Sequence, residues 1–172
     1  MRKAASFPMF SYALRAFRDG DAAKVDELAL AAFDQFRLQY SDWPAMASAI
    51  GRMSVLADTG EIIAAERDER IIGAVAYIAA GRPKAAYFDR SWPIIRMLVV
   101  DPASRGSGVG RALTEECMNR ARRDGSRVIA LHTSPIMTVA LPMYLRMGFR
   151  LAQVAPPIYG VPYAVYLKHL GG

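Results

Sequence analysis

A glycine-rich loop flanked by arginines is the segment whose residue types point most directly to chemistry. Residues 105–111 read Arg-Gly-Ser-Gly-Val-Gly-Arg, and they follow an apolar run that ends at Val100 and is succeeded by Asp101. Helical spacing of apolar residues begins inside the loop. Backbone N–H groups at a helix N-terminus bind phosphate, and glycines let a ligand approach the backbone closely. The loop therefore predicts an anion site, to which Arg105 and Arg111 add charge-assisted hydrogen bonds.

The spacing of the glycines excludes two common nucleotide sites. Gly106 and Gly108 match the start of the dinucleotide fingerprint G-x-G-x-x-G, but Arg111 stands at its third glycine position. The next expected strand ends in Leu-His-Thr-Ser, without the acid that would bind a ribose. A P-loop is also excluded, because no G-K-[ST] follows the glycines. A pyrophosphate fits the arrangement that remains.

The elements that must position this loop alternate between strand and helix patterns. A strand is expected over 11–18, followed by a helix that Asp19 or Asp21 caps and by a second helix over 44–57. A hairpin over 61–67 and 71–80 precedes the buried strand in 92–100. A helix over 107–124, a strand over 127–134, a short helix and two final strands complete the order. The pattern predicts a mixed α/β sheet with helices on its faces.

Prolines restrict where helices and strands can lie in the last third of the chain. Pro142 is tolerated in the first turn of a helix but not deep inside one, so the short helix is expected to begin near Val139. The two final strands are expected to be joined by a loop that contains Pro156, Pro157 and Gly160.

Composition restricts the class of protein. The 172 residues are 53% hydrophobic and 22% charged, which suits one packed domain. A single cysteine, Cys117, excludes an internal disulfide and a cysteine metal site, and it is expected in the core. The net charge is +6, but the arginines gather around 105–127, which favours a compact anion over nucleic acid.

Neither a membrane span nor secretion is expected. No apolar stretch is long enough to cross a bilayer. Residues 1–19 superficially resemble a signal peptide, but Arg15 and Arg18 interrupt its apolar core. The expected location is the cytoplasm, and no metal is expected.

Several segments together resemble a known family. Arg105 to Gly110 satisfies [RQ]-x-x-G-x-[GA], and "MLVVDP" before it, "RALTEECMNRARRDG" after it and the later "ALPMYLRMGF" are similar to the GCN5-related N-acetyltransferases. The resemblance covers residues 12–168. It implies a single domain over 1–172 with a mixed, mostly antiparallel sheet of about seven strands and helices on both faces. It also implies direct transfer of acetyl from acetyl-CoA to a primary amine of a small molecule, peptide or protein.

The resemblance assigns roles to particular residues. The backbone of Leu98, Val99 and Val100 would pair with the pantetheine arm, and an N–H at Val99 or Val100 would polarise the thioester carbonyl. Tyr144 would protonate the leaving thiolate. Ser134 ends a strand beside the expected cofactor, either as a cap or as a contact. The pyrophosphate would be held by seven consecutive residues: Arg105, Gly106, Ser107, Gly108, Val109, Gly110 and Arg111.

One departure from the family leaves the general base open. Many members carry a glutamate on the strand before the loop, but here that strand reads "IIRMLVV" with Arg96. Glu66, Asp89 or an ordered water chain could replace it, or the amine could arrive neutral; Arg96 could instead attract an acidic acceptor. The missing carboxylate also leaves a second hypothesis, a non-catalytic acyl-CoA-binding module.

The sequence leaves two interpretations of the residues around the acceptor open. His132 is expected to be a structural histidine with satisfied hydrogen bonds rather than a base. The aromatic residues of the first two helices and the last hairpin could form an amine pocket, or could be core or a homodimer contact. They are Phe36, Tyr40, Trp43, Tyr77, Tyr87, Tyr159 and Tyr163.

Overall fold

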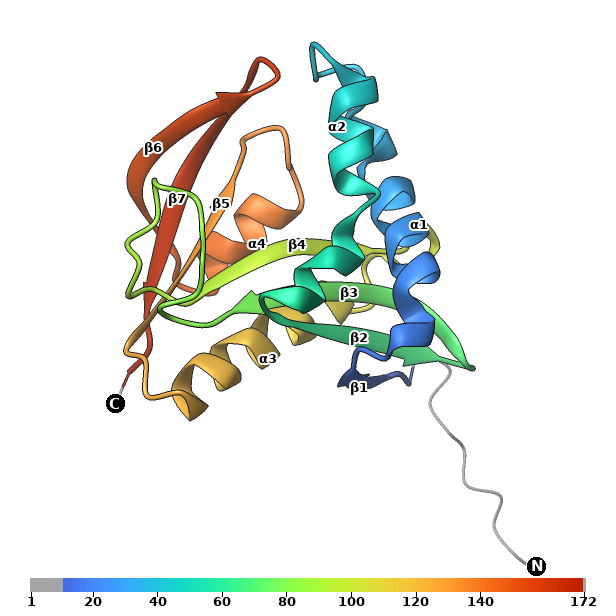
Figure 1. Ribbon diagram of the computed structural model, residues 1–172, viewed down its shortest axis with the longest axis horizontal. Coiled ribbons are helices and arrows are strands. Elements are labelled where there is room, and N and C mark those ends of the chain that lie inside the picture. Colours follow the sequence, from blue (N-terminus) through green and yellow to red (C-terminus); the bar gives the residue numbers. More distant parts are fainter. Residues whose placement is uncertain (1–10, 172) are drawn as a thin grey trace, which may run out of the picture.

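A computed structural model describes residues 11–171, so part of the signal-like segment discussed above lies outside the described residues. One seven-stranded sheet organises the chain (Figure 1). The strands are β1 (Ala13–Ala16), β2 (Glu61–Arg67), β3 (Arg70–Ile78), β4 (Ile94–Val100), β5 (Val128–Thr133), β6 (Arg150–Ile158) and β7 (Val161–His169). The α-helices are α1 (Ala22–Phe33), α2 (Trp43–Ile50), α3 (Val109–Arg123) and α4 (Ala140–Arg146).

The sheet confirms the expected fold class. Its strand order is β1-β2-β3-β4-β5-β7-β6, and every neighbouring pair is antiparallel except β4 and β5. That parallel pair is joined only at Ile94 and Ala130. Beyond Ile94 the two strands diverge, so the edge of β4 that faces β5 is left without a strand partner. The centre of the sheet therefore contains an opening where a ligand can reach backbone groups.

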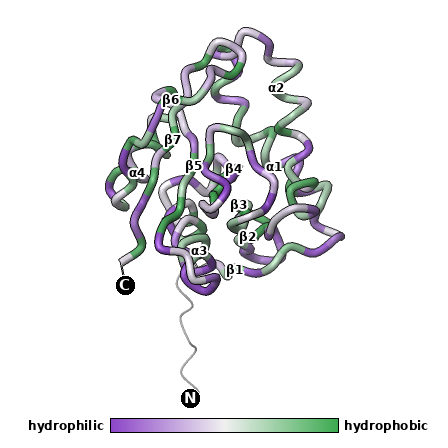
Figure 2. Tube along the Cα trace, turned by 60° about the vertical axis from the view of Figure 1, so that its left-hand side comes forward, coloured by the Kyte–Doolittle hydropathy of each residue, from purple (hydrophilic) through white to green (hydrophobic). Residues whose placement is uncertain are grey.

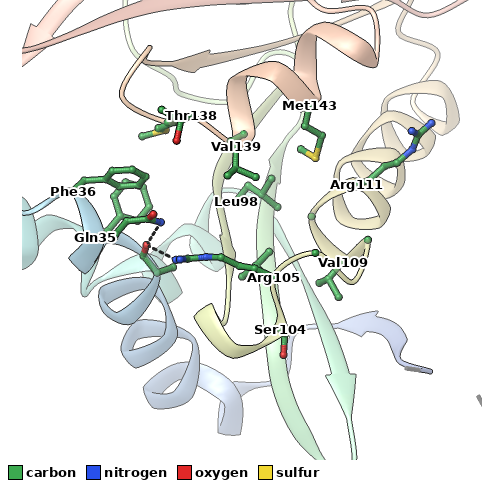
Figure 3. Close-up of a pocket in the computed structure, with 18 of the residues that line it drawn as sticks. Gln35, Phe36, Leu98, Ser104, Arg105, Val109, Arg111, Thr138, Val139 and Met143 are labelled. Carbon is green, nitrogen blue, oxygen red and sulfur yellow. Dashed lines mark hydrogen bonds between the residues drawn. The ribbon is translucent and has the colours of Figure 1, made fainter. Parts of the chain in front are cut away.

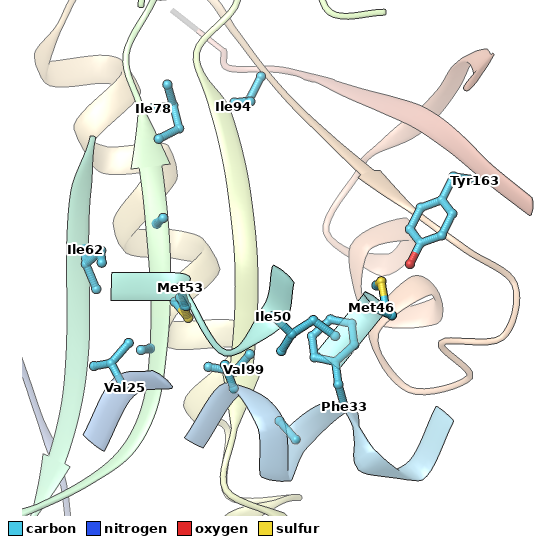
Figure 4. Close-up of a cluster of buried hydrophobic side chains, with 14 of the residues drawn as sticks. Val25, Phe33, Met46, Ile50, Met53, Ile62, Ile78, Ile94, Val99 and Tyr163 are labelled. Carbon is cyan, nitrogen blue, oxygen red and sulfur yellow. The ribbon is translucent and has the colours of Figure 1, made fainter. Parts of the chain in front are cut away.

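Helices cover both faces of the sheet and bury two apolar clusters. α1 and α2 cover one face, where Val25, Phe33 and Ile50 gather around Val99, and Ile78 and Ile94 lie at the other end of the same cluster (Figure 4). α3 and α4 cover the other face, where residues such as Leu113, Cys117 and Phe149 are buried. Hydrophobic residues concentrate in the strands, whereas α3 and the peripheral loops carry much of the hydrophilic surface (Figure 2). Burial of Cys117 in this cluster confirms it as a core residue.

The second helix is shorter than the spacing predicts. α2 ends at Ile50, and the chain continues through a separate 3₁₀ segment over Met53–Asp58. Gly51 lies at the end of α2, where its N–H bonds to the carbonyl of Ala47. Apolar residues continue at helical spacing across this break, so periodicity alone does not reveal it. At the start of α2 the Asp42 carboxylate accepts from the N–H of Ala45 at 3.0 Å, as an N-cap should.

The final hairpin also differs from the expectation. Pro156 and Pro157 lie inside β6 rather than in the connecting loop, and the turn is Tyr159-Gly160 with positive φ angles of 43° and 79°. β6 is an edge strand with an irregular register between Ala155 and Ile158. Prolines are tolerated there because an edge strand has backbone groups without ladder partners. The expected start of the short helix near Val139 is confirmed, since Val139 is the N-cap of α4.

A glycine on β3 sets the position of α3. A Cβ built on Gly73 would lie 2.8 Å from Cγ1 of Val109 and 3.1 Å from Cδ1 of Leu113. The first turn of α3 therefore packs directly on the β3 backbone, at a distance that only glycine permits. This contact aligns the N-terminus of α3 with the open edge of β4.

Candidate functional site

The glycine-rich loop forms one wall of a cleft of about 370 Å³, here called the loop cleft. Gly106, Gly108 and Gly110 line it from one side, and Leu98 and Val100 contribute from β4. Val139 and Met143 enter from the α4 side, opposite Arg105 (Figure 3). The cleft thus combines the loop, the open β4 edge and α4, which are separated in the sequence.

The loop backbone has the conformation of an anion cradle. Gly106 and Gly108 have φ angles of +77° and +83°, which only glycine adopts without strain. A Cβ added to either would meet no protein atom within 4 Å, so open space lies beside the backbone. Gly108 is the N-cap of α3 and forms no side-chain cap, which leaves the first N–H groups of the helix available. These groups and the helix dipole favour a negatively charged ligand.

The arginines near the loop have different surroundings. A guanidinium nitrogen of Arg105 donates to the carbonyl of Ala32 at 3.3 Å, so this side chain spans the cleft to the end of α1 (Figure 3). Arg111 lines the cleft and pairs with Glu115 at 3.0 Å, an exposed pair that ligand phosphates can disrupt at little cost. Arg146 at the end of α4 also lines the cleft. Sequence reasoning missed Arg146, because its distance from the loop is set by the placement of α4.

Not every predicted contact residue presents its side chain to the cleft. The Ser107 hydroxyl donates to the carbonyl of Ser104 at 2.5 Å and so holds the loop closed on itself. Val99 is 1% exposed and packs on the α1 face, which leaves only its backbone for a ligand. Ser134 is fully buried, and its hydroxyl accepts from the N–H of Ile136 at 3.3 Å. Cofactor contacts for these three residues stay predictions.

A bulge in β4 changes which side chains face the opening. Between Ala74 and Ala76 of β3 the register shifts, and two residues of β4, Met97 and Leu98, lie opposite one of β3. Met97 has a φ of +54°, which is unusual for a residue with a side chain. The bulge interrupts the alternation of the strand, and both Arg96 and Met97 line a second cavity.

This second cavity, here called the aromatic cavity, has a volume of about 680 Å³. It shares Phe33, Leu98, Met137 and Ala140 with the loop cleft, so the two spaces meet at these side chains. Tyr87, Tyr159 and Tyr163 form part of its wall, as expected for three members of the aromatic set. Tyr77 does not, because it is buried on the α3 face and donates to Asp124 at 2.8 Å.

Two hydrogen bonds involve Tyr159 and Tyr163 of the aromatic cavity wall. The N–H of Ser41 donates to the carbonyl of Tyr159 at 2.8 Å, and the Tyr40 and Tyr163 hydroxyls lie 2.5 Å apart. They tie the segment between α1 and α2 to the β6–β7 hairpin. Segments far apart in the sequence are therefore held together beside the aromatic cavity.

Tyr144 lies on α4 with its ring buried against Phe149, at a centroid separation of 5.6 Å. It lines the aromatic cavity, next to the side chains that the two cavities share. Within residues 11–171 its hydroxyl forms no hydrogen bond with another residue. Burial raises the pKa of Tyr144 above that of an exposed tyrosine, so the phenol keeps its proton at neutral pH.

His132 lies in the wall of the aromatic cavity rather than in the closed core. Its Nδ1 is 2.9 Å from the Tyr87 hydroxyl, and its ring stacks on Phe88 and meets Tyr163 edge-on. Burial, with a smaller effect from the positive charge of Arg96, lowers the pKa of His132 to about 4. The imidazole is therefore neutral at physiological pH and is part of a hydrogen-bonded aromatic group.

The low pKa of His132 predicts a specific loss of stability in acid. Between pH 6.5 and 4 the unfolded chain binds a proton on His132 that the folded chain does not, so stability falls as the pH drops. From pH 7 to 4.5 this loss should amount to about 2–3 kcal/mol. Urea unfolding of the wild type and of His132→Gln at both pH values measures it. The variant should lose less stability than the wild type by that amount; equal losses would contradict the assignment.

The carboxylates considered as bases lie elsewhere. Glu66 accepts from Nε of Arg15 at 2.7 Å, and Arg15 also forms a bidentate pair with Asp21. Asp89 is exposed and accepts from the N–H and hydroxyl of Ser91. Neither Glu66 nor Asp89 lines either cavity.

Within residues 11–171 no helix is long and apolar enough to cross a membrane.

The glycine loop lies at a strand-to-helix junction and opens onto the free edge of β4 and onto a second cavity, so the fold and the site together have the geometry of an anion-binding cleft in a mixed α/β sheet. The sequence profile of the Acetyltransferase (GNAT) family matches residues 23–149, and the chain belongs to this family. The family expectation is thereby confirmed.

Individual proteins agree with this assignment. A mycothiol acetyltransferase of Sanguibacter keddieii is 35% identical over 147 residues, covering 82% of this chain and 44% of that protein. The chain thus spans less than half the length of that relative. A structure from Pyrococcus horikoshii OT3 superposes with a TM-score of 0.75 at 14% identity, over 94% of this chain and 99% of the other. PaiA N-acetyltransferase of Thermoplasma acidophilum, in complex with coenzyme A, has a TM-score of 0.72 at 15% identity, over 93% and 99%. At these identities the two structures support the fold.

Proposed function

We propose that this protein transfers the acetyl group of acetyl-CoA directly to a primary amine. The observation that carries the proposal is that the loop cleft and the aromatic cavity meet beside Tyr144. One space has the character of an anion site and the other has room for an acceptor. The relative from Sanguibacter keddieii is itself named a mycothiol acetyltransferase, which supports this reaction class.

The loop cleft fits the phosphates and the pantetheine arm of acetyl-CoA. The backbone N–H groups of the loop and the start of α3 would hold the pyrophosphate, with Arg111 and Arg146 at the rim. The free edge of β4 over 98–100 would pair with the amides of the arm in the manner of an added strand. A backbone N–H at Val99 or Val100 would polarise the thioester carbonyl.

Tyr144 is the group suited to protonate the departing thiolate. Its raised pKa keeps the phenol protonated, and its hydroxyl has no competing partner among the described residues. As the thiolate leaves, the phenol O–H bond breaks and the proton passes to sulfur. The amine proton has no carboxylate to receive it, because the described walls of the two cavities contain neither aspartate nor glutamate. The amine proton can instead pass to an ordered chain of water molecules, or the amine can bind in its neutral form.

The same lack of a carboxylate favours one alternative, a binding module that holds acyl-CoA without turning it over. This alternative shares the loop cleft with the enzyme and differs only in catalysis. Binding and turnover therefore have to be measured separately.

A thermal-shift titration tests the cofactor assignment. A ligand that binds only the folded state raises its apparent stability. Acetyl-CoA should raise the melting temperature, dephospho-CoA should raise it less, and NAD and ATP should have small effects. No shift with acetyl-CoA, or a larger shift with NAD or ATP, would contradict the proposal. Turnover of acetyl-CoA in an amine screen then separates the enzyme from the binding module.

A further inference from the structure

Two arginines in the wall of the aromatic cavity are not neutralised. Arg96 projects from β4 and Arg52 from the segment after α2, and both line the cavity. Within residues 11–171 neither forms a salt bridge, and the described wall contains no acidic residue. His132 adds no positive charge at neutral pH. The cavity therefore presents two cationic groups and no anion.

This arrangement differs from that of the arginines that form ion pairs within residues 11–171. Arg15, Arg120 and Arg123 each pair with at least two carboxylates at 2.7–3.2 Å. Within the part of the chain that the structure describes, no carboxylate lies within ion-pair distance of Arg96 or Arg52. An arginine on the central strand of a sheet is itself unusual, because such strands are mostly apolar. The bulge at Met97 keeps Arg96 on the cavity side together with its neighbour.

The rest of the wall is apolar or aromatic. Met46, Ile50, Met53 and Ile158 line it, together with Tyr87 and Tyr163. Such a wall suits a carbon skeleton. A polycationic amine would have no carboxylate to bind and would be repelled by the two guanidinium groups.

We propose that the acceptor is a primary amine that also bears an anionic group, a carboxylate or a phosphate, and that Arg96 with Arg52 binds this group. The proposal rests on the proposed acetyl transfer and specifies the substrate class of that same site. A guanidinium group binds a carboxylate or a phosphate through paired hydrogen bonds, so the arginines by themselves suit either anion.

Matched amines test the charge requirement directly. For each of a set of skeletons (glycine, alanine, leucine, methionine and phenylalanine), the amino acid, its primary amide and its decarboxylated amine are assayed for CoA release from acetyl-CoA. O-Phosphotyramine and tyramine form the phosphate arm, and spermidine is the polycation. For at least one skeleton, the anionic member should exceed its amide in kcat/KM by at least about tenfold. A preference confined to O-phosphotyramine would identify phosphate as the anion.

Substitutions at Arg96 connect the preference to the cavity. Arg96→Gln should reduce the ratio of kcat/KM between the anionic amine and its amide toward one, and Arg96→Lys should retain part of it. Arg52→Gln should reduce the ratio as well. Arg70→Gln is the matched control, because Arg70 is exposed at the start of β3 and lines neither cavity. Its ratio should equal that of the wild type.

The outcomes separate the two proposals. A preference for neutral or cationic amines would overturn the anionic acceptor and leave acetyl transfer standing. Binding of acetyl-CoA without turnover of any anionic amine in the set would also overturn it. Failure of acetyl-CoA to bind would instead overturn the proposed function itself. An unchanged ratio in Arg96→Gln would show that another group selects the substrate.

Discussion

Replacing Tyr144 with phenylalanine is expected to lower kcat for acetyl transfer by about 10²- to 10⁴-fold, the usual contribution of a general acid. The change removes only the hydroxyl. The ring keeps its edge contact with Phe149, and no hydrogen bond to a described residue is lost. Folding stability should therefore change little, and the affinity for acetyl-CoA should stay within about twofold of the wild type. Steady-state kinetics and a binding titration on the same sample measure both quantities.

Tyr166→Phe provides the matched control. Tyr166 lies on β7, is partly buried and lines neither cavity. Its variant should have the kcat of the wild type. If Tyr144→Phe and Tyr166→Phe turn over equally fast, Tyr144 does not protonate the thiolate. If Tyr144→Phe also binds acetyl-CoA much more weakly, the residue is part of the binding wall instead.

Replacing Gly108 with alanine is expected to weaken acetyl-CoA binding by at least about tenfold. The φ of +83° is strained for any residue with a Cβ, at a cost of about 1–2 kcal/mol. Relief of that strain would rotate the loop and turn the first N–H groups of α3 away from the phosphates. The added methyl also projects beside the cleft, where no protein atom lies within 4 Å. Isothermal titration calorimetry with acetyl-CoA measures the loss.

Gly125→Ala separates this loss from a general effect of strain. Gly125 follows the other end of α3, has a φ of +79°, is exposed and also has no protein atom within 4 Å of a built Cβ. The two variants should lose similar stability by urea unfolding. Only Gly108→Ala should lose affinity for acetyl-CoA. Equal affinities in the two variants would show that the loop does not bind the cofactor.

The positions of the elements were largely predictable from local patterns. The hairpin turn was expected over 68–70, between the strands over 61–67 and 71–80. The turn found is one residue shorter, because Arg70 already belongs to β3, and both Asp68 and Glu69 have the positive φ angles of a two-residue hairpin turn. The helix after the loop was expected over 107–124 and is found over Val109–Arg123. Both features depend on neighbours in the chain, such as turn residues and helical spacing. Two predictions were wrong because local signals conflict. Helical spacing continues past Ile50 although Gly51 ends the helix, and Pro156 and Pro157 indicate a loop although they lie in an edge strand.

The sequence alone determined the family and the fold class and predicted an anion site at the loop, because a short glycine motif and the periodicity around it are local properties. The tertiary structure decided which side chains line the aromatic cavity. Arg52, Arg96, His132, Tyr144 and Tyr163 come from five separate segments and share one cavity only because β4 and β5 diverge beyond Ile94. The bulge at Met97, the burial that lowers the pKa of His132 and the absence of a carboxylate from the described wall all depend on that packing. Long-range packing of this kind leaves no local signature in the order of residues.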